Sequence, residues 1–184
     1  MQEQRLGWET AAAGARPDRR GTAPLYTAEQ RRRRDRSRWT LVQGILAPLQ
    51  FGVFLVSLGL IVHTLLTGHG MALATASVVV KTLLLYAIMV TGSLWERDVF
   101  GRYLFAPAFF WEDVVSMAVL ALHTLYLAAW LLEALPGRGQ LLLALAAYAT
   151  YVVNAAQFLL KLRMARGQAA AAAAPGGSSL GPAQ

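Results

Sequence analysis

The chain has 184 residues, of which 56 % are hydrophobic and 15 % are charged, and its formal net charge is +7. Soluble domains carry about 25 % charged residues, so this composition is typical of a membrane protein. The absence of cysteine excludes disulfides, thiolate zinc sites, iron–sulfur clusters and thiol redox chemistry. No Gly-rich phosphate-binding loop is present, so nucleotide-driven chemistry has no visible site.

The N-terminal region separates into a tail and a short helix. Residues 1–26 are polar, with scattered Gly, Pro and Ala, and predict a disordered cytoplasmic tail. Thr27 and Gln30 have the spacing of a capping box, which predicts an amphipathic juxtamembrane helix from Thr27 onward. This helix carries a run of arginines beside the first apolar segment and is expected to contact anionic lipid head groups. We prefer this membrane role to RNA binding and expect no nucleic-acid partner.

Four apolar segments are long enough to cross the hydrocarbon core of a bilayer, which takes about 20 helical residues. The predicted fold is therefore an all-α integral membrane bundle of four transmembrane helices, formed by one domain at residues 27–166. Residues 167–184 are rich in Ala, Gly, Ser and Pro and predict a second disordered tail. The predicted spans are residues 41–65, 71–94, 114–135 and 141–161, with an interfacial loop at 95–113.

The distribution of Lys and Arg predicts the orientation of the bundle. Fifteen of these residues lie on the side of the two termini, Arg138 alone lies on the other side, and Lys81 lies inside a span. The side with more positive charge faces the cytoplasm. Both termini and the loop at 95–113 are therefore expected to be cytoplasmic.

Polar residues inside the spans are candidates for function. Lys81 and His123 each lie ten residues into a span, near mid-depth. An ionisable group there costs about 2.5–3.5 kcal/mol on insertion scales, so it is expected to face protein or water. The fourth span carries a polar stripe within an arc of roughly 60°, formed by Thr150, Asn154, Gln157 and Lys161. The alternative for this stripe is interhelical hydrogen bonding, worth about 0.6 kcal/mol for each bond.

The loop at 95–113 combines seven aromatic residues with four carboxylates and two arginines. An aromatic belt at the head-group level explains the rings but does not explain the carboxylates. Asp113 also suits the first turn of a helix, where negative charge is stabilised. An aromatic, charged site at the membrane surface suits a large, flat, amphiphilic ligand with an acidic edge.

Several runs of the sequence resemble one family over residues 25–166. They are LYTAEQRRRRD at 25–35, WTLVQGILAPLQF at 39–51, VFGRYLFAPAFFWED at 99–113, ALHT at 121–124 and NAAQF at 154–158. The chain is similar in these motifs to the 3-vinyl bacteriochlorophyllide hydratase (2-vinyl bacteriochlorophyllide hydratase) family. The resemblance implies a hydro-lyase that adds water to the C3 vinyl group of a chlorophyllide, giving a 1-hydroxyethyl group in bacteriochlorophyll biosynthesis. It also implies a multi-pass protein of the bacterial inner membrane, cytoplasmic or intracytoplasmic.

This chemistry requires a general acid for the terminal vinyl carbon and a base for the attacking water, with pKa values near the operating pH. We hypothesise that Glu96 and Glu112 are the acid and base, with Asp113 as a substitute. His123 is an alternative proton donor, or an axial ligand to the chlorin magnesium. We expect no cofactor and no protein-bound metal, because magnesium enters only as part of the substrate.

The remaining candidates are assigned to substrate binding. Arg97 or Arg102 could pair with the substrate propionate, because a guanidinium matches a carboxylate in shape. The other candidate contacts, which the hypothesis places in the same site, are Lys81, Trp95, Tyr103, Trp111, Asn154 and Gln157.

Two other functions were weighed against the hydratase. A non-catalytic chlorophyllide-binding or pigment-assembly protein would use the same aromatic, His and Arg residues, and turnover alone separates it from the enzyme. A small transporter is disfavoured because the two halves share no visible repeat. The expected partners are a chlorophyllide-type tetrapyrrole and the lipid bilayer. Homo-oligomerisation and association with other pigment-biosynthesis enzymes are left open.

Overall fold

The computed structural model describes residues 25–173, which form five α-helices joined by short connections. Four of these helices are long and apolar enough to cross a membrane, which confirms the all-α, four-span fold. The helices are α1 (Ala28–Arg36), α2 (Arg38–Thr67), α3 (Met71–Phe100), α4 (Phe110–Leu131) and α5 (Gly137–Ala173).

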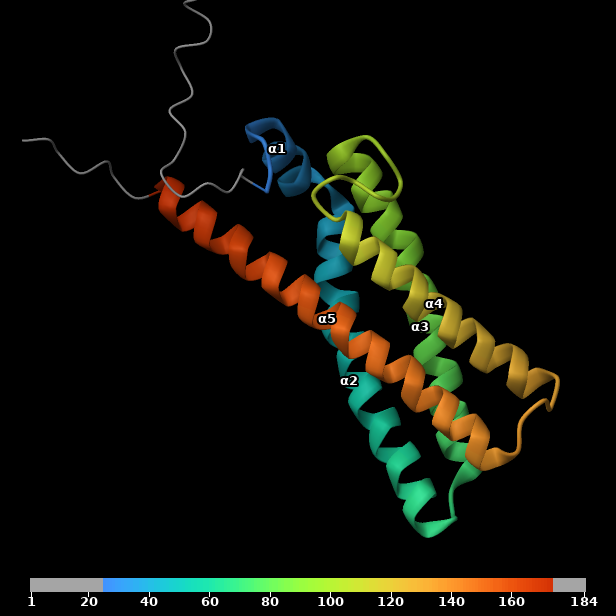
Figure 1. Cartoon of the computed structure of the whole chain (residues 1–184). Helices are drawn as coiled ribbons and strands as arrows, with labels where there is room; N and C mark the ends of the chain where they lie inside the picture. The colour runs from blue at the N-terminus through green and yellow to red at the C-terminus, as the bar shows by residue number, and fades with distance from the viewer. Residues whose placement is uncertain (1–24, 174–184) are drawn as a thin grey trace, which may run out of the picture.

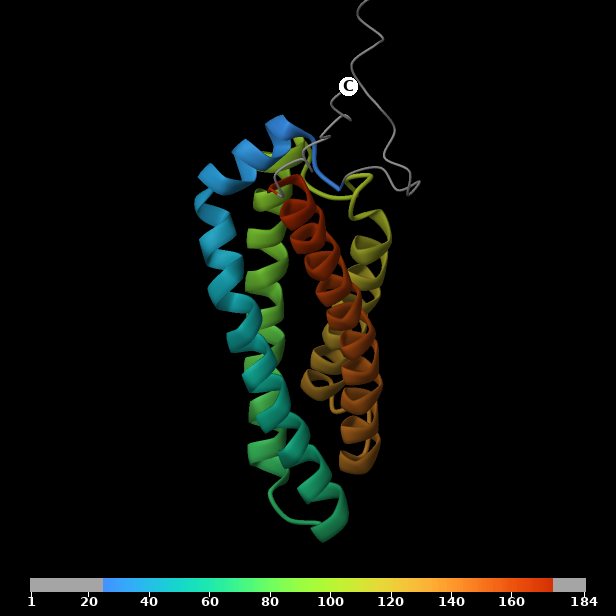
Figure 2. The ribbon, with the colours of Figure 1, turned by 90° about the vertical axis from the view of Figure 1, so that its left-hand side faces the viewer.

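The four long helices form an elongated bundle whose two ends differ (Figures 1 and 2). α2 packs along α3, α4 packs along α5, and α5 also contacts α2 and α3. The connections α2–α3 and α4–α5 lie at one end of the bundle. α1, the loop at 101–109 and the C-terminal end of α5 lie together at the other end (Figure 1). The loop that the sequence marks as functional is therefore next to both chain ends.

The short helix α1 begins at the predicted capping box. The Thr27 hydroxyl accepts a hydrogen bond from the Gln30 amide at 3.2 Å, and the Gln30 side chain accepts one from the Thr27 amide at 2.9 Å. All nine residues of α1 are polar or alanine, and none is buried. The apolar contacts of this region come instead from Leu25 and Tyr26, which pack on the end of the bundle.

Several helix boundaries differ from the predicted spans. α3 continues to Phe100 and α4 begins at Phe110, so the connecting loop is only nine residues long, 101–109. α4 ends at Leu131, four residues before the predicted end of the third span. α5 continues to Ala173, because its last residues are alanines, which have the highest helix propensity. Residues 1–24 and 174–184 of the two predicted tails lie outside the described residues.

The interior of the bundle is apolar but contains a chain of hydroxyl groups that joins three helices. Tyr148 of α5 donates to the Ser57 hydroxyl of α2 at 2.6 Å, and Ser57 is hydrogen-bonded to Ser77 of α3 at 2.7 Å. Phe54 and Ile61 pack beside them in the main apolar cluster. These hydrogen bonds connect the α2–α3 pair to α5 at mid-bundle.

Replacing Tyr148 with Phe should destabilise the protein by about 0.6–1.7 kcal/mol, because it removes a buried interhelical hydrogen bond. Tyr86→Phe is the matched control, since Tyr86 also bonds a hydroxyl, that of Thr124, but at an exposed position. Unfolding in detergent mixtures measures both variants. Equal stability of the two variants would show that the buried chain does not hold the helices together.

Candidate functional site

Two carboxyl groups meet at the loop end of the bundle. Glu96 lies one turn before the end of α3 and Asp113 lies in the first turn of α4, and their carboxyl groups are close enough to act electrostatically on each other. Both residues are buried, with exposed fractions of 5 % for Glu96 and 4 % for Asp113. Two bare carboxylates in contact repel each other strongly, and a hydrogen bond between them needs a proton. We refer to Glu96 and Asp113 as the carboxyl pair.

The loop at 101–109 lies over this carboxyl pair and binds it with backbone amides. The Phe105 amide donates to Asp113 Oδ2 at 2.7 Å, and the Ala106 amide donates to Glu96 Oε2 at 3.2 Å. Phe105 reaches this position with φ = 58°, a left-handed conformation that is uncommon for a residue with a bulky side chain. Gly101 begins the loop at φ = 79°, where the absence of a Cβ avoids strain.

The third buried carboxylate, Glu112, has different partners. Its Oε2 atom lies 3.4 Å from Lys161 Nζ of α5, so it forms an ion pair. Asn154 of α5 donates to the Glu112 backbone carbonyl at 3.1 Å and to the Ser116 hydroxyl at 2.9 Å. Glu112 is thus paired with a cation, whereas the neighbouring carboxyl pair is bound by backbone amides of the loop.

An aromatic cluster packs beside the carboxyl groups. Trp95, Phe100 and Phe109 contact one another with ring centres 5.6–5.9 Å apart. Tyr26 stacks on Phe100 at 5.9 Å, which brings the segment before α1 onto the loop. Burial raises the pKa of the Tyr26 phenol, although the Arg34 guanidinium near its ring opposes this shift.

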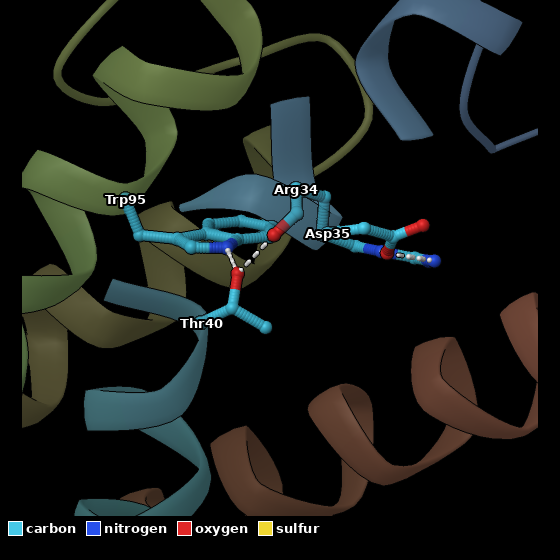
Figure 3. A network of polar contacts seen from close by, with 4 residues as sticks. All are labelled: Arg34, Asp35, Thr40 and Trp95. Atoms are coloured by element: carbon cyan, nitrogen blue, oxygen red, sulfur yellow. Dashed lines mark hydrogen bonds and ion pairs between the residues drawn. The ribbon is translucent and has the colours of Figure 1, made fainter. Parts of the chain in front are cut away.

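Trp95 also fixes the junction of α1 and α2 to α3 (Figure 3). Its indole N–H donates to the Thr40 hydroxyl at 3.0 Å, and the same hydroxyl donates to the Arg34 carbonyl at 2.6 Å. Asp35, drawn in the same view, pairs with the Arg34 guanidinium at 2.7 Å. The predicted substrate contact Trp95 therefore has a structural role in the described chain.

Four of the predicted substrate contacts lie on the outer rim of the loop. The Arg97 guanidinium lies 5.1 Å from the centre of the Tyr103 ring, and Arg102 makes a long contact of 3.5 Å to the Phe105 carbonyl. Tyr103 and Trp111 are 54 % and 69 % exposed. These cations and aromatic rings are thus exposed, whereas the carboxyl pair is covered.

Lys81 and His123 lie together deeper in the bundle, and both residues are fully buried. Lys81 Nζ lies 3.8 Å from the centre of the Tyr151 ring, and the His123 ring stacks on Tyr148 at 5.8 Å. His123 Nδ1 is 2.8 Å from the Val119 carbonyl, which can only accept, so Nδ1 carries the hydrogen. Within residues 25–173, neither Lys81 Nζ nor His123 Nε2 has a hydrogen-bond partner.

The predicted site residues therefore fall into two groups rather than one. Ten residues of α4 separate Asp113 from His123, which is about 15 Å of helix, and fifteen residues of α3 separate Glu96 from Lys81, about 22 Å. Asn154 belongs to the group at the loop end through its contacts with α4. Gln157 lies one turn further along α5. Its side-chain oxygen is buried and unpaired among the described residues.

Lys161 is the functional-site residue that the sequence hypothesis did not include. The polar stripe predicted on the fourth span includes Lys161, and this stripe is the sequence signal that could have identified it. The partner could not be identified from sequence, because the contact depends on where α5 crosses α4. In the part of the chain that the structure describes, no group of three or more His, Asp or Glu side chains is placed to hold a metal ion.

Comparison with known proteins decides the family. The pattern of the 2-vinyl bacteriochlorophyllide hydratase (BCHF) family matches residues 26–164. A 2-vinyl bacteriochlorophyllide hydratase of Cereibacter sphaeroides is 66 % identical over 152 residues, covering 83 % of this chain and 92 % of the relative. One of Rhodobacter capsulatus is 65 % identical over 146 residues, covering 79 % and 85 %. No solved structure matches the chain.

The chain belongs to the 2-vinyl bacteriochlorophyllide hydratase family. This confirms the predicted family and enzyme class: the protein is a hydratase that acts on vinyl bacteriochlorophyllide in bacteriochlorophyll biosynthesis. The matched region, 26–164, includes the carboxyl pair, the loop, Glu112 and Lys161. A hydratase needs both a proton donor and a proton acceptor, and three buried carboxyl groups lie at the loop end of the bundle.

Replacing Glu96 with Ala should loosen the loop of this hydratase, because the Ala106 amide loses its acceptor. Hydrogen exchange of the backbone amides at 101–109 should become faster than in the unmodified protein. Asp98→Ala is the matched control, since Asp98 is an exposed carboxylate on the same helix that bonds Ser37 instead of the loop. Unchanged exchange in the Glu96 variant would show that the carboxyl pair does not hold the loop.

Proposed function

We propose that the chain hydrates the vinyl group of a bacteriochlorophyllide at the loop end of the bundle. The Glu96–Asp113 carboxyl pair acts as the acid, and Glu112 acts as the base. The single observation that carries this assignment is the contact between Glu96 and Asp113 beside a separately ion-paired Glu112. Two neighbouring carboxyl systems held in opposite protonation states match the two proton transfers of a hydration.

The reaction begins with a proton passing from the carboxyl pair to the terminal carbon of the vinyl group. The positive charge that forms on the inner carbon is delocalised into the macrocycle. Water attacks this carbon, and Glu112 takes the proton that the water loses, giving the 1-hydroxyethyl group. Transfer of that proton back to the pair restores the starting state. Nothing is oxidised or reduced, because the step adds only the elements of water.

Access to the carboxyl pair requires the loop at 101–109 to move. Glu96 and Asp113 are almost fully covered by this loop, and its backbone amides occupy carboxylate oxygens that the substrate must approach. The exposed rings of Tyr103 and Trp111 suit the flat faces of a chlorin. Arg97 and Arg102, at the rim, suit its propionate. We therefore place the macrocycle under the opened loop with its acidic edge toward these two arginines.

His123 remains our prediction for the axial ligand of the substrate magnesium. Its Nδ1 hydrogen is bound by the Val119 carbonyl, which leaves the Nε2 lone pair free, as in metal-bound histidines. The distance of about 15 Å of helix from Asp113 means that such a substrate would extend from the loop into the bundle interior. Lys81, beside His123, would then lie against the buried part of the macrocycle.

We infer that the protein lies in the bacterial inner membrane with the loop end in the cytoplasm. α1, the loop at 101–109 and the end of α5 lie at the same end of the bundle (Figure 1), and among the described residues they carry nine basic residues, whereas Arg138 is at the opposite end. The excess of positive charge at this end supports the cytoplasmic assignment. The substrate would then enter from the interface, where an amphiphilic tetrapyrrole concentrates.

The function is tested with purified protein in detergent, vinyl bacteriochlorophyllide and ¹⁸O-labelled water. The product should be one labelled water heavier than the substrate, because the hydroxyl oxygen comes from solvent. Glu96→Gln and Glu112→Gln should each lower kcat on the order of 10²–10⁴-fold, the usual contribution of a general acid or base. Asp98→Asn, at an exposed position of α3, should keep full activity.

Two outcomes would contradict this proposal. A pigment that binds but leaves without added water would identify the protein as a carrier instead of an enzyme. Full turnover by both glutamine variants would remove the carboxyl groups from the mechanism and leave the hydratase activity itself unaffected.

A further inference from the structure

Lys161 lies where α5, α4 and the loop at 101–109 meet. Its Nζ atom donates a hydrogen bond to the Ala108 carbonyl of the loop. The same atom lies 3.4 Å from Glu112 Oε2 and 5.4 Å from the centre of the Phe109 ring. The Lys161 side chain therefore contacts the last two residues of the loop, Ala108 and Phe109, and Glu112 in the first turn of α4.

Lys161 is a cation that lies among buried carboxyl groups at this end of the bundle. Three carboxyl groups are buried there, and Lys161 is the counter-charge that lies beside Glu112. Within residues 25–173, Lys161 is the cation that forms an ion pair with a buried carboxylate. A buried carboxylate that loses its cation is strongly destabilised in its charged form.

A single face of α5 holds Glu112 at two points. Asn154 and Lys161 are seven residues apart, which places them on the same side of a helix. Asn154 binds the backbone carbonyl of Glu112, and Lys161 binds its carboxylate. The backbone and the side chain of Glu112 are thus both fixed by α5, and Lys161 fixes the loop at Ala108 as well.

We propose that Lys161 is a positioning residue for the hydration. It supplies the counter-charge of Glu112 and fixes the position of its carboxylate, and it anchors the C-terminal part of the loop that covers the carboxyl pair. The substrate is not required to touch Lys161, which acts through Glu112 and the loop. This inference rests on the proposed function, in which Glu112 is the base.

The test compares Lys161→Met, Lys161→Arg and the control Arg163→Met. Met keeps much of the length of the lysine side chain without its charge, and Arg163 is an exposed cation two residues further along α5. With vinyl bacteriochlorophyllide as substrate, Lys161→Met should lower kcat on the order of 10²-fold, as expected for an impaired base. KM should change little, because substrate contacts stay in place. Lys161→Arg should restore most of the activity, and Arg163→Met should equal the unmodified protein.

Hydrogen exchange of the loop provides a second readout that does not depend on turnover. The amides of Phe105 and Ala106 should exchange faster in Lys161→Met than in the unmodified protein, and Lys161→Arg should restore their protection. A Lys161→Met variant with unchanged kcat and unchanged exchange would overturn the inference and leave the proposed function intact. A loss of kcat that Lys161→Arg does not recover would also overturn it. If the unmodified protein does not hydrate the pigment, the proposed function fails, and exchange still tests the anchor.

Discussion

The contact between Glu96 and Asp113 is the constraint on which the functional end of this molecule depends. Two acidic side chains from different helices are buried together, which is tolerable only if they share a proton and their remaining oxygens are hydrogen-bonded. The loop at 101–109 meets the second requirement with two backbone amides, and it adopts a strained conformation at Phe105 to do so. The nine-residue loop, its left-handed residues and its position over the bundle all follow from the need to satisfy these carboxyl groups.

The rest of the bundle serves to bring the two acids together. α3 supplies Glu96 and α4 supplies Asp113. α5 packs along α4, so that Asn154 and Lys161 reach the first turn of α4. Further from the loop, the hydroxyl chain at mid-bundle connects α5 to α2 and α3. The carboxyl pair and the ion-paired Glu112 thus lie within one turn of helix, where the proposed acid and base of the hydratase are next to each other.

Much of this could be predicted from the sequence because the physical signals are local. Apolar runs of membrane length predicted four spans, and the capping box at Thr27 predicted where α1 begins. The acidic residues of the middle loop were singled out because an aromatic belt does not need them. The pairing of Glu96 with Asp113 instead of Glu112, and the role of Lys161, could not be predicted, since both depend on how helices far apart in sequence cross. Lys81 and His123 lie deeper in the bundle and form a second group. Each residue of a helix advances about 1.5 Å, so the fifteen and ten residues between them and the carboxyl pair amount to about 22 Å and 15 Å.

The most direct test of this account is the infrared spectrum of the purified protein at neutral pH. A carboxyl pair that shares a proton predicts a carbonyl stretching band of a protonated carboxyl group, shifted in deuterated water and lost in Glu96→Gln or Asp113→Asn. Asp98→Asn should leave the band unchanged, because that side chain is exposed. If the unmodified protein shows no such band, or if neither pair variant removes it, the carboxyl pair holds no shared proton. The proposed source of the vinyl proton would then be contradicted.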